Sequence, residues 1–304
     1  MKYTTETIQT IFSMKQQGYS SRQIANHFGI SKSGVNDMLN RYAPKIKPKG
    51  MRLCFIDIET SCDIAVSFKR FKTSYGQDSV LQDGGTILSI SWQYNDETEP
   101  SGLALTPYEA VNNDDSRLVA TLIELIEDSD AICGHNIVQF DDAVIQARSA
   151  INGFAPHKLV KRIDTLRIAR QMKFPSNKLD SLGHMLGVGR KLEHQGIKLW
   201  IDCMFGHQEA LDKMLAYNKQ DVTLLIDVYQ KLKAFDSQAP NAGLYTDQDV
   251  PVCRVCGSTH VEPTGNVVTT SVSKFIEVQC GECGARSRTR QALNSSKDRK
   301  KLLV

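Results

Sequence analysis

The chain has 304 residues, of which 41% are hydrophobic and 23% are charged, the composition of a globular protein with one large domain or several smaller ones. It contains no uncharged apolar run of about 18 residues and no compact apolar run near its start, which excludes an obvious membrane span or signal peptide and leads us to expect a cytoplasmic protein. The net charge is only +3, but it is uneven. Residues 1–50 contain eight Lys and Arg against two acids, residues 250–304 contain nine against four, and the middle is acidic.

Apolar spacing predicts three short helices in residues 1–43. Ser20 and Gln23 form the Ser-x-x-Gln pattern of a capping box that opens the second helix. Gly29 ends that helix, and Ser31 caps the third. The stretch GYSSRQIANHFGISKSGVNDML resembles the helix-turn-helix of transposases and small regulators, which implies a nucleic-acid recognition helix; a small helical bundle that contacts protein is the alternative. The outward residues predicted to contact nucleic acid are Lys32, Ser33, Asn36, Asn40 and Arg41.

The composition of residues 44–50, with three lysines and two prolines, predicts a basic linker. From residue 51 to residue 233, strand and helix patterns alternate, which predicts an α/β domain with helices packed on a mixed sheet. The strands are expected at 53–59, 86–94 and 131–135, and the helices at 118–126 and 141–151.

Four carboxylates of this middle region occur in three different elements. Asp57 and Glu59 end an apolar strand and project from one of its faces, an arrangement that is costly unless a cation binds both. Asp141 follows a second apolar strand. Tyr217 and Asp221 lie four residues apart, so one helix face presents both. Convergent acids from three elements predict one metal-binding site, although each acid alone could be a surface carboxylate.

These residues resemble the three exonuclease motifs of the DEDD superfamily of 3′–5′ exonucleases. The matching segments are FIDIET, Asn136-x-x-x-Phe140-Asp141 and Tyr217-x-x-x-Asp221. The spacing of the third motif favours the tyrosine (DEDDy) subtype over the histidine subtype, whose spacing is one residue longer. The resemblance covers the middle region and implies a ribonuclease-H-like fold.

The resemblance also implies a role for each motif residue, with two Mg²⁺ or Mn²⁺ ions in the site. Asp57 is expected to bridge both ions. Glu59 and Asp221 would hold the first ion, and Asp141 would bind the second. Tyr217 would orient the attacking water. Residues expected to contact the substrate, or to support the turn beside it, are Thr60, Asn136 and Phe140.

Residues 234–250 predict a second linker, which precedes two cysteine pairs. Cys253-x-x-Cys256 and Cys280-x-x-Cys283 are separated by 23 residues and resemble a β zinc ribbon. Four thiolates satisfy tetrahedral Zn²⁺ and leave no open position, so one structural zinc ion is expected. Two disulfides or a redox pair are the alternative.

The expected ribbon covers residues 251–290 and is followed by a basic tail, residues 291–304. Arg286, Arg288 and Arg290 alternate, which predicts that they line one face of a strand. That face would either contact phosphates or simply be solvated.

The sequence therefore predicts a metal-dependent 3′–5′ exonuclease that acts on single-stranded DNA or frayed duplex in a proofreading- or repair-like role. RNA also suits the motifs, and a separate DNA polymerase is a further candidate partner. One alternative is a ribonuclease-H-like transposase or resolvase that cuts DNA internally; it explains the flanking domains but usually lacks the Asp-x-Glu pair. Another is an inert DNA-binding regulator, which would usually have lost one of the acids. As a conjecture, so compact a chain suits a bacterium or a phage.

Overall fold

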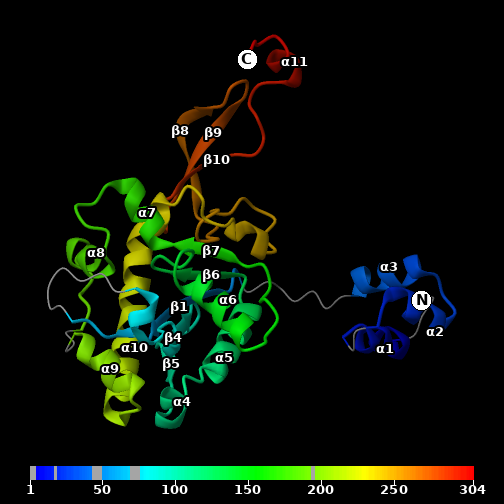
Figure 1. The fold of residues 1–304 in the computed structure, drawn as a ribbon. Helices are drawn as coiled ribbons and strands as arrows, with labels where there is room; N and C mark the ends of the chain where they lie inside the picture. The colour runs from blue at the N-terminus through cyan, green and yellow to red at the C-terminus, as the bar shows by residue number, and fades with distance from the viewer. Residues whose placement is uncertain (1–4, 17–18, 43–49, 69–75, 193–195) are drawn as a thin grey trace. The chain divides into compact units, whose positions relative to one another are not determined.

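The computed structural model divides into two compact units, Met1–Pro48 and Lys49–Val304. All but the last residue of the predicted linker at 44–50 lies outside the described residues. In the described part of the chain, no helix combines the length and the apolar character needed to cross a bilayer. The structure describes residues 5–16, 19–42, 50–68, 76–192 and 196–304 (Figure 1).

The first unit contains the three predicted helices, α1 (Thr5–Gln16), α2 (Ser21–Phe28) and α3 (Lys32–Tyr42). Ser20 and Gln23 form the predicted capping box at the start of α2. Gly29 ends α2 in the left-handed region, with φ 63°, where a residue without Cβ is favoured. The Ser31 hydroxyl accepts a hydrogen bond from the Gly34 N–H at 3.0 Å. All three helices contribute to a small core of Ile11, Ile24, Ala25, Val35 and Met38.

The second unit is built on a five-stranded mixed sheet in the order β5-β4-β1-β6-β7. The central strand β1 pairs with β4 in antiparallel fashion and with β6 in parallel fashion. Its first four residues are buried, which explains the continuous apolar run in the sequence. This mixed sheet confirms the α/β layout predicted for residues 51–233. The strands are β1 (Leu53–Thr60), β4 (Ile87–Tyr94), β5 (Ser101–Ala104), β6 (Ala131–Gly134) and β7 (Lys161–Asp164).

Helices pack on both faces of this sheet. On one face, the Tyr229 ring of α10 lies 5.4 Å from the Phe55 ring of β1. On the other face, the Tyr94 hydroxyl donates to the Leu125 carbonyl of α5 at 3.3 Å. The helices are α4 (Pro107–Val111), α5 (Ser116–Glu127), α6 (Asp141–Ile151), α7 (Thr165–Met172), α8 (Leu179–Met185), α9 (Ile197–Met204) and α10 (Gln208–Leu232), and the small elements between β1 and β4 are β2 (Ile64–Ala65), η1 (Gln77–Ser79) and β3 (Val80–Gln82).

The stretch predicted as a second linker packs against its neighbours. Asp236 is buried and pairs with Arg167 of α7 at 3.3 Å, and its carbonyl accepts a hydrogen bond from Arg254 at 2.8 Å. A three-stranded antiparallel sheet follows, in the order β10-β9-β8. The elements of this region are η2 (Lys233–Phe235), η3 (Ala242–Tyr245), β8 (Val261–Thr269), β9 (Lys274–Cys280), β10 (Arg286–Arg288) and α11 (Ser296–Arg299).

Asp164 connects the carboxyl ends of two neighbouring strands. It is 5% exposed, and its Oδ1 accepts hydrogen bonds from the backbone N–H groups of Leu166 and Asn136, both at 2.9 Å, and of Arg167 at 3.3 Å. The same carboxylate therefore caps α7 and holds the turn that follows β6.

We expect Asp164→Ala to lower the free energy of unfolding by about 2 kcal/mol, because it leaves backbone donors without an acceptor. Asp164→Asn should cost less, since the amide oxygen still accepts. Urea titration measures both variants. Asp96→Ala, which removes an exposed carboxylate, is the control and should stay within about 0.5 kcal/mol of wild type. An equal loss in Asp96→Ala and Asp164→Ala would contradict the capping role.

Candidate active site

Three of the predicted acids meet at one place. Asp57 and Glu59 project from the same face of β1, and Asp221 faces them from α10; oxygens of the three carboxylates lie within 4.8 Å of one another. Asp57 and Glu59 are partly exposed, whereas Asp221 is fully buried. The strand period and the helix position together bring acids 164 residues apart in the chain into one group.

Asp141 lies beside this group, in the first turn of α6. It is 2% exposed, and its Oδ1 accepts a hydrogen bond from the Ile58 backbone N–H, between Asp57 and Glu59, at 3.3 Å. Among the described residues, it is not one of those whose oxygens fall within the 4.8 Å group. The fourth acid is therefore adjacent to the other three.

Tyr217 and Asp221 share one face of α10, and a lysine contacts both. Lys191 donates to Asp221 Oδ2 at 2.5 Å and to the Tyr217 hydroxyl at 3.2 Å. Burial lowers the pKa of Lys191, but the Asp221 carboxylate outweighs burial and raises it. Burial and Asp221 together raise the pKa of Tyr217 to about 12. Near neutral pH the lysine is thus a cation and the tyrosine a neutral phenol.

Sequence reasoning did not assign three side chains that touch this site, namely Lys191, Asn218 and Trp200. Asn218 Nδ2 donates to Asp57 Oδ2 at 2.5 Å. The Trp200 side chain of α9 hydrogen-bonds to Glu59, and its ring lies 6.2 Å from the Tyr217 ring. For Asn218 the sequence contained a signal, because this polar residue lies next to Tyr217 and three residues before Asp221. In the structure, all three side chains are buried on α10.

Burial first, and the neighbouring carboxylates next, raise the pKa values of Asp57, Glu59 and Asp141. Burial raises the pKa of Glu59 to about 7, with Lys191 opposing and Asp221 reinforcing the rise. Burial also raises the pKa of Asp141 to about 7. The pKa of Asp57 lies well above its usual range because of burial and three neighbouring carboxylates. A divalent cation would relieve this repulsion, and donors that are all carboxylate oxygens fit Mg²⁺ or Mn²⁺.

Two of the residues expected near the substrate, Asn136 and Phe140, lie at the turn after β6, and the third, Thr60, lies at the end of β1. Asn136 has a φ of 72°, and its carbonyl accepts the Phe140 N–H at 3.0 Å. Phe140 is 41% exposed just before α6, and Thr60 ends β1 after an irregularity in its pairing with β4. A cavity of about 710 Å³ opens beside this turn. Its lining includes Asn136, Arg170, Lys178, Asp180 and Lys191.

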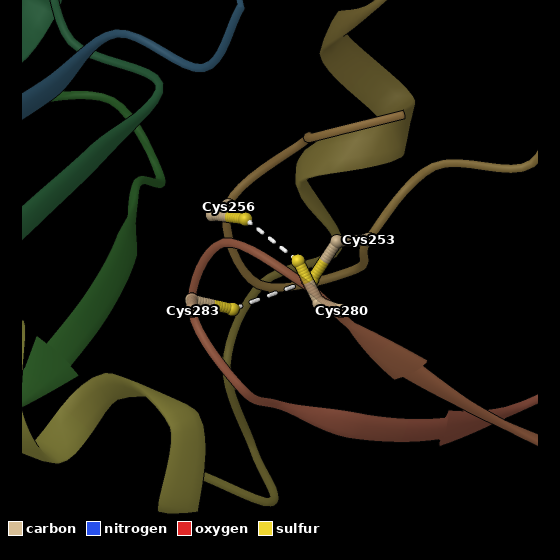
Figure 2. A group of neighbouring side chains, drawn as sticks. All are labelled: Cys253, Cys256, Cys280 and Cys283. Atoms are coloured by element: carbon tan, nitrogen blue, oxygen red, sulfur yellow. Dashed lines mark hydrogen bonds between the residues drawn. The ribbon is translucent and has the colours of Figure 1, made fainter. Parts of the chain in front are cut away.

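The four cysteines of the two Cys-x-x-Cys pairs converge (Figure 2). Cys253 lies 3.6 Å from Cys283, and Cys256 lies 3.6 Å from Cys280; all four sulfurs are within 4.8 Å of one another and none is disulfide-bonded. Burial raises the pKa of Cys280, but hydrogen bonds from the backbone of Cys283 and Glu282 outweigh burial and lower it to about 7. This set of four sulfur donors fits a tetrahedral zinc ion.

The predicted arginine face is shorter than expected. Arg286 and Arg288 are exposed on β10, but β10 ends at Arg288, so the prediction that Arg290 lies on this strand is wrong. Arg288 stacks on the Phe275 ring at 3.9 Å. At Thr289 only half of the next ladder pair forms. The Thr289 N–H donates to the Ile276 carbonyl of β9 at 3.0 Å, but the Ile276 N–H donates to the Thr289 hydroxyl at 3.3 Å, so a side chain takes the place of the backbone acceptor where β10 ends.

The residues predicted to contact nucleic acid from the third helix lie on α3. Lys32, Ser33 and Asn36 are exposed there. The side chains of Asn40 and Arg41 fall outside the described residues. The described part of α3 therefore presents one cation and two hydrogen-bonding side chains to solvent.

Comparison with known proteins finds a family match for the middle of the chain. Residues 80–233, just over half of the chain, match the family described as the RNase_H superfamily. This range includes Asp141, Tyr217 and Asp221. No curated protein matches the chain. Among solved structures, it is similar to the family B DNA polymerase from the hyperthermophilic archaeon Pyrobaculum calidifontis, with 16% identity and a TM-score of 0.45 over 60% of this chain and 25% of the polymerase chain.

We expect the metal-free protein to lose stability as pH rises. Glu59 and Asp141 have ordinary pKa values of 4.5 and 3.8 and values of about 7 in the folded protein, so their contribution is fully present below about pH 4 and is lost as pH rises through about 7. In metal-free buffer, the melting temperature of wild type should therefore fall between pH 5 and pH 8 by a few degrees more than that of Glu59→Gln. Added Mn²⁺ should remove most of the difference. Parallel curves for the two proteins would contradict the electrostatic account.

Proposed function

The chain belongs to the RNase_H superfamily, and from this premise we propose that it is a metal-dependent nuclease that removes nucleotides from the 3′ end of a strand, with a site of the tyrosine DEDD subtype. One observation carries the proposal: Asp57, Glu59 and Asp221 meet within 4.8 Å, and Tyr217 shares the helix face of Asp221. Clustering three carboxylates costs free energy because they repel one another and are removed from water. Such a cluster is therefore typical of a site that binds cations.

In this proposal the acids divide the work of holding two Mg²⁺ or Mn²⁺ ions. Asp57, which interacts with all three other acids, would serve both ions. Glu59 and Asp221 would hold the first, and Asp141, which is adjacent to the group, would serve the second. When bound, such ions neutralise charge at the scissile phosphate and lower the pKa of a water molecule.

Tyr217 and Lys191 contribute groups that the acids cannot. With a pKa of about 12, the Tyr217 phenol stays protonated near neutral pH and can orient the attacking water by hydrogen bonding. Lys191 contacts both Tyr217 and Asp221 and also lines the adjacent cavity. It is therefore placed to meet a substrate phosphate that enters from the cavity side.

The flanking regions serve, in this proposal, as nucleic-acid contacts. The three-helix unit acts as a helix-turn-helix and presents α3, and the cysteine-bearing sheet is a zinc ribbon that presents Arg286 and Arg288. The excess of Lys and Arg in both regions supports this assignment. The proposed substrate is single-stranded DNA or frayed duplex, with RNA and a partner DNA polymerase as further candidates.

The first test uses a single-stranded DNA oligonucleotide labelled at its 5′ end, with Mg²⁺ or Mn²⁺. Wild type should produce a descending ladder of one-nucleotide steps. Asp57→Ala should lower the rate at least about 100-fold because it removes the bridging ligand. Tyr217→Phe should lower kcat about 10- to 100-fold and leave metal binding intact, since it removes only the hydroxyl.

Other outcomes of this assay point to other proteins. A few discrete internal cuts would favour a transposase or resolvase. No cleavage of DNA or of a matched RNA, despite Mn²⁺ binding, would favour a binding protein with an inert nuclease fold. The RNA arm also decides the sugar preference.

A second test concerns the four cysteines. We expect the purified chain to contain one zinc ion, and Cys280→Ser to lose it, because three thiolates and a hydroxyl form a much weaker site. Zinc content measures the loss directly, and limited proteolysis should then cut within residues 251–290. Cys62→Ser, which removes a free cysteine outside the cluster, should keep its zinc. Equal zinc content in Cys280→Ser and wild type would refute the ribbon.

A further inference from the structure

A buried amide hydrogen-bonds to Asp57, the carboxylate that interacts with all three other acids. Asn218 lies on α10 between Tyr217 and Asp221 and is fully buried. Its Nδ2 donates to Asp57 Oδ2 at 2.5 Å, across 161 residues of sequence. Within the described residues its Oδ1 has no hydrogen-bond partner. The contact with Asp57 is thus what orients this amide, since a buried amide is costly unless it is hydrogen-bonded.

A neutral donor suits this position better than a cation. Asp57 faces Asp141, Asp221 and Glu59, so its ionised form needs stabilisation. A hydrogen bond from an amide stabilises the ionised carboxylate. It adds no charge that would compete with a divalent ion for that carboxylate. It also uses one acceptor site of the carboxylate and leaves the others available. Lys191, in contrast, forms an ion pair with Asp221.

The sheet beneath α10 is shaped for this contact. Ser91 of β4 pairs with Asp57 of β1, and Gly102 of β5 pairs with Ser91. A Cβ at residue 102 would lie 2.6 Å from Ser91 Oγ and 2.9 Å from Leu215 Cδ1 of α10. The missing side chain therefore lets α10 lie close to the sheet, at the depth from which Asn218 reaches Asp57.

From this geometry we propose that Asn218 is a positioning residue that holds the Asp57 carboxylate in the orientation needed for binding metal ions. Without the hydrogen bond, the carboxylate would rotate among several orientations, only some of which face both ions. Asn218 then sets the affinity of the site for divalent ions and leaves the affinity for the nucleic acid unchanged. This inference rests on the proposed function, because it takes Asp57 as the bridging ligand.

The test compares full-length wild type with Asn218→Leu, whose side chain has the same number and branching of heavy atoms but no hydrogen-bond donor. Mn²⁺ binding is measured by calorimetry, and the Mn²⁺ bound by Asp57→Ala is subtracted. We expect Asn218→Leu to bind Mn²⁺ about tenfold more weakly or worse, as is usual when a group that orients a metal ligand is removed. The Mn²⁺ concentration for half-maximal cleavage should rise equally, excess Mn²⁺ should restore most of kcat, and KM for the oligonucleotide should change less than about twofold.

Met214→Leu is the matched control. Met214 is buried on the same helix one turn earlier, so this variant alters packing without removing a hydrogen bond and should bind Mn²⁺ like wild type. Should Asn218→Leu fail to fold, Asn218→Ser has the same expected loss of affinity. Wild-type Mn²⁺ affinity in the folded variant would overturn the inference, even if its melting temperature falls.

The same data separate this inference from the proposed function. If wild type and Asp57→Ala bind Mn²⁺ equally, Asp57 is no metal ligand and both ideas fail. If wild type binds Mn²⁺ through Asp57 and cleaves DNA, but Asn218→Leu binds Mn²⁺ as tightly, only the positioning role fails.

Discussion

The repulsion among four clustered carboxylates, two buried and two partly buried, is the constraint around which the second unit is organised. Asp57, Glu59, Asp141 and Asp221 come from β1, α6 and α10, and none of these elements would place them together without support from the rest of the fold. Burial and mutual proximity raise the pKa values of the first three. Such an arrangement opposes folding, so it requires a stable framework around it.

The framework supplies that stability through the central strand and one long helix. The apolar residues of β1 are buried before the strand reaches Asp57, and α10 packs along it through contacts such as Phe55 with Tyr229. Lys191 adds a compensating cation at Asp221. Asp164 fixes the turn after β6, from which α6 and Asp141 follow. Contacts from several elements thus hold the acidic group in place.

The cysteine cluster packs against the residues that follow α10. Arg254, next to Cys253, donates to the carbonyl of Asp236, just beyond η2, and Asp236 pairs with Arg167 of α7. Ala234 and Ala239 pack against the cluster. Residues of the stretch 234–250 therefore make fixed contacts with both α7 and the cysteine cluster. A solvated linker would make no such contacts.

Sequence by itself determined the features that depend on neighbours in the chain. The caps at Ser20 and Ser31, the alternation of strands and helices, the period of two that pairs Asp57 with Glu59 and the period of four that pairs Tyr217 with Asp221 all follow from local geometry, and the structure contains each of them. The clustering of the four cysteines likewise agrees with their spacing.

Only the tertiary structure decided which side chains meet those acids. Asn218, Trp200 and Lys191 reach the site across separations of up to 161 residues, and no local periodicity encodes such contacts. The end of β10 at Arg288 likewise depends on its pairing with β9, which residues 286–290 alone do not specify. Contacts of this kind arise from the way helices pack on a sheet, so they are set by the whole fold rather than by any one segment.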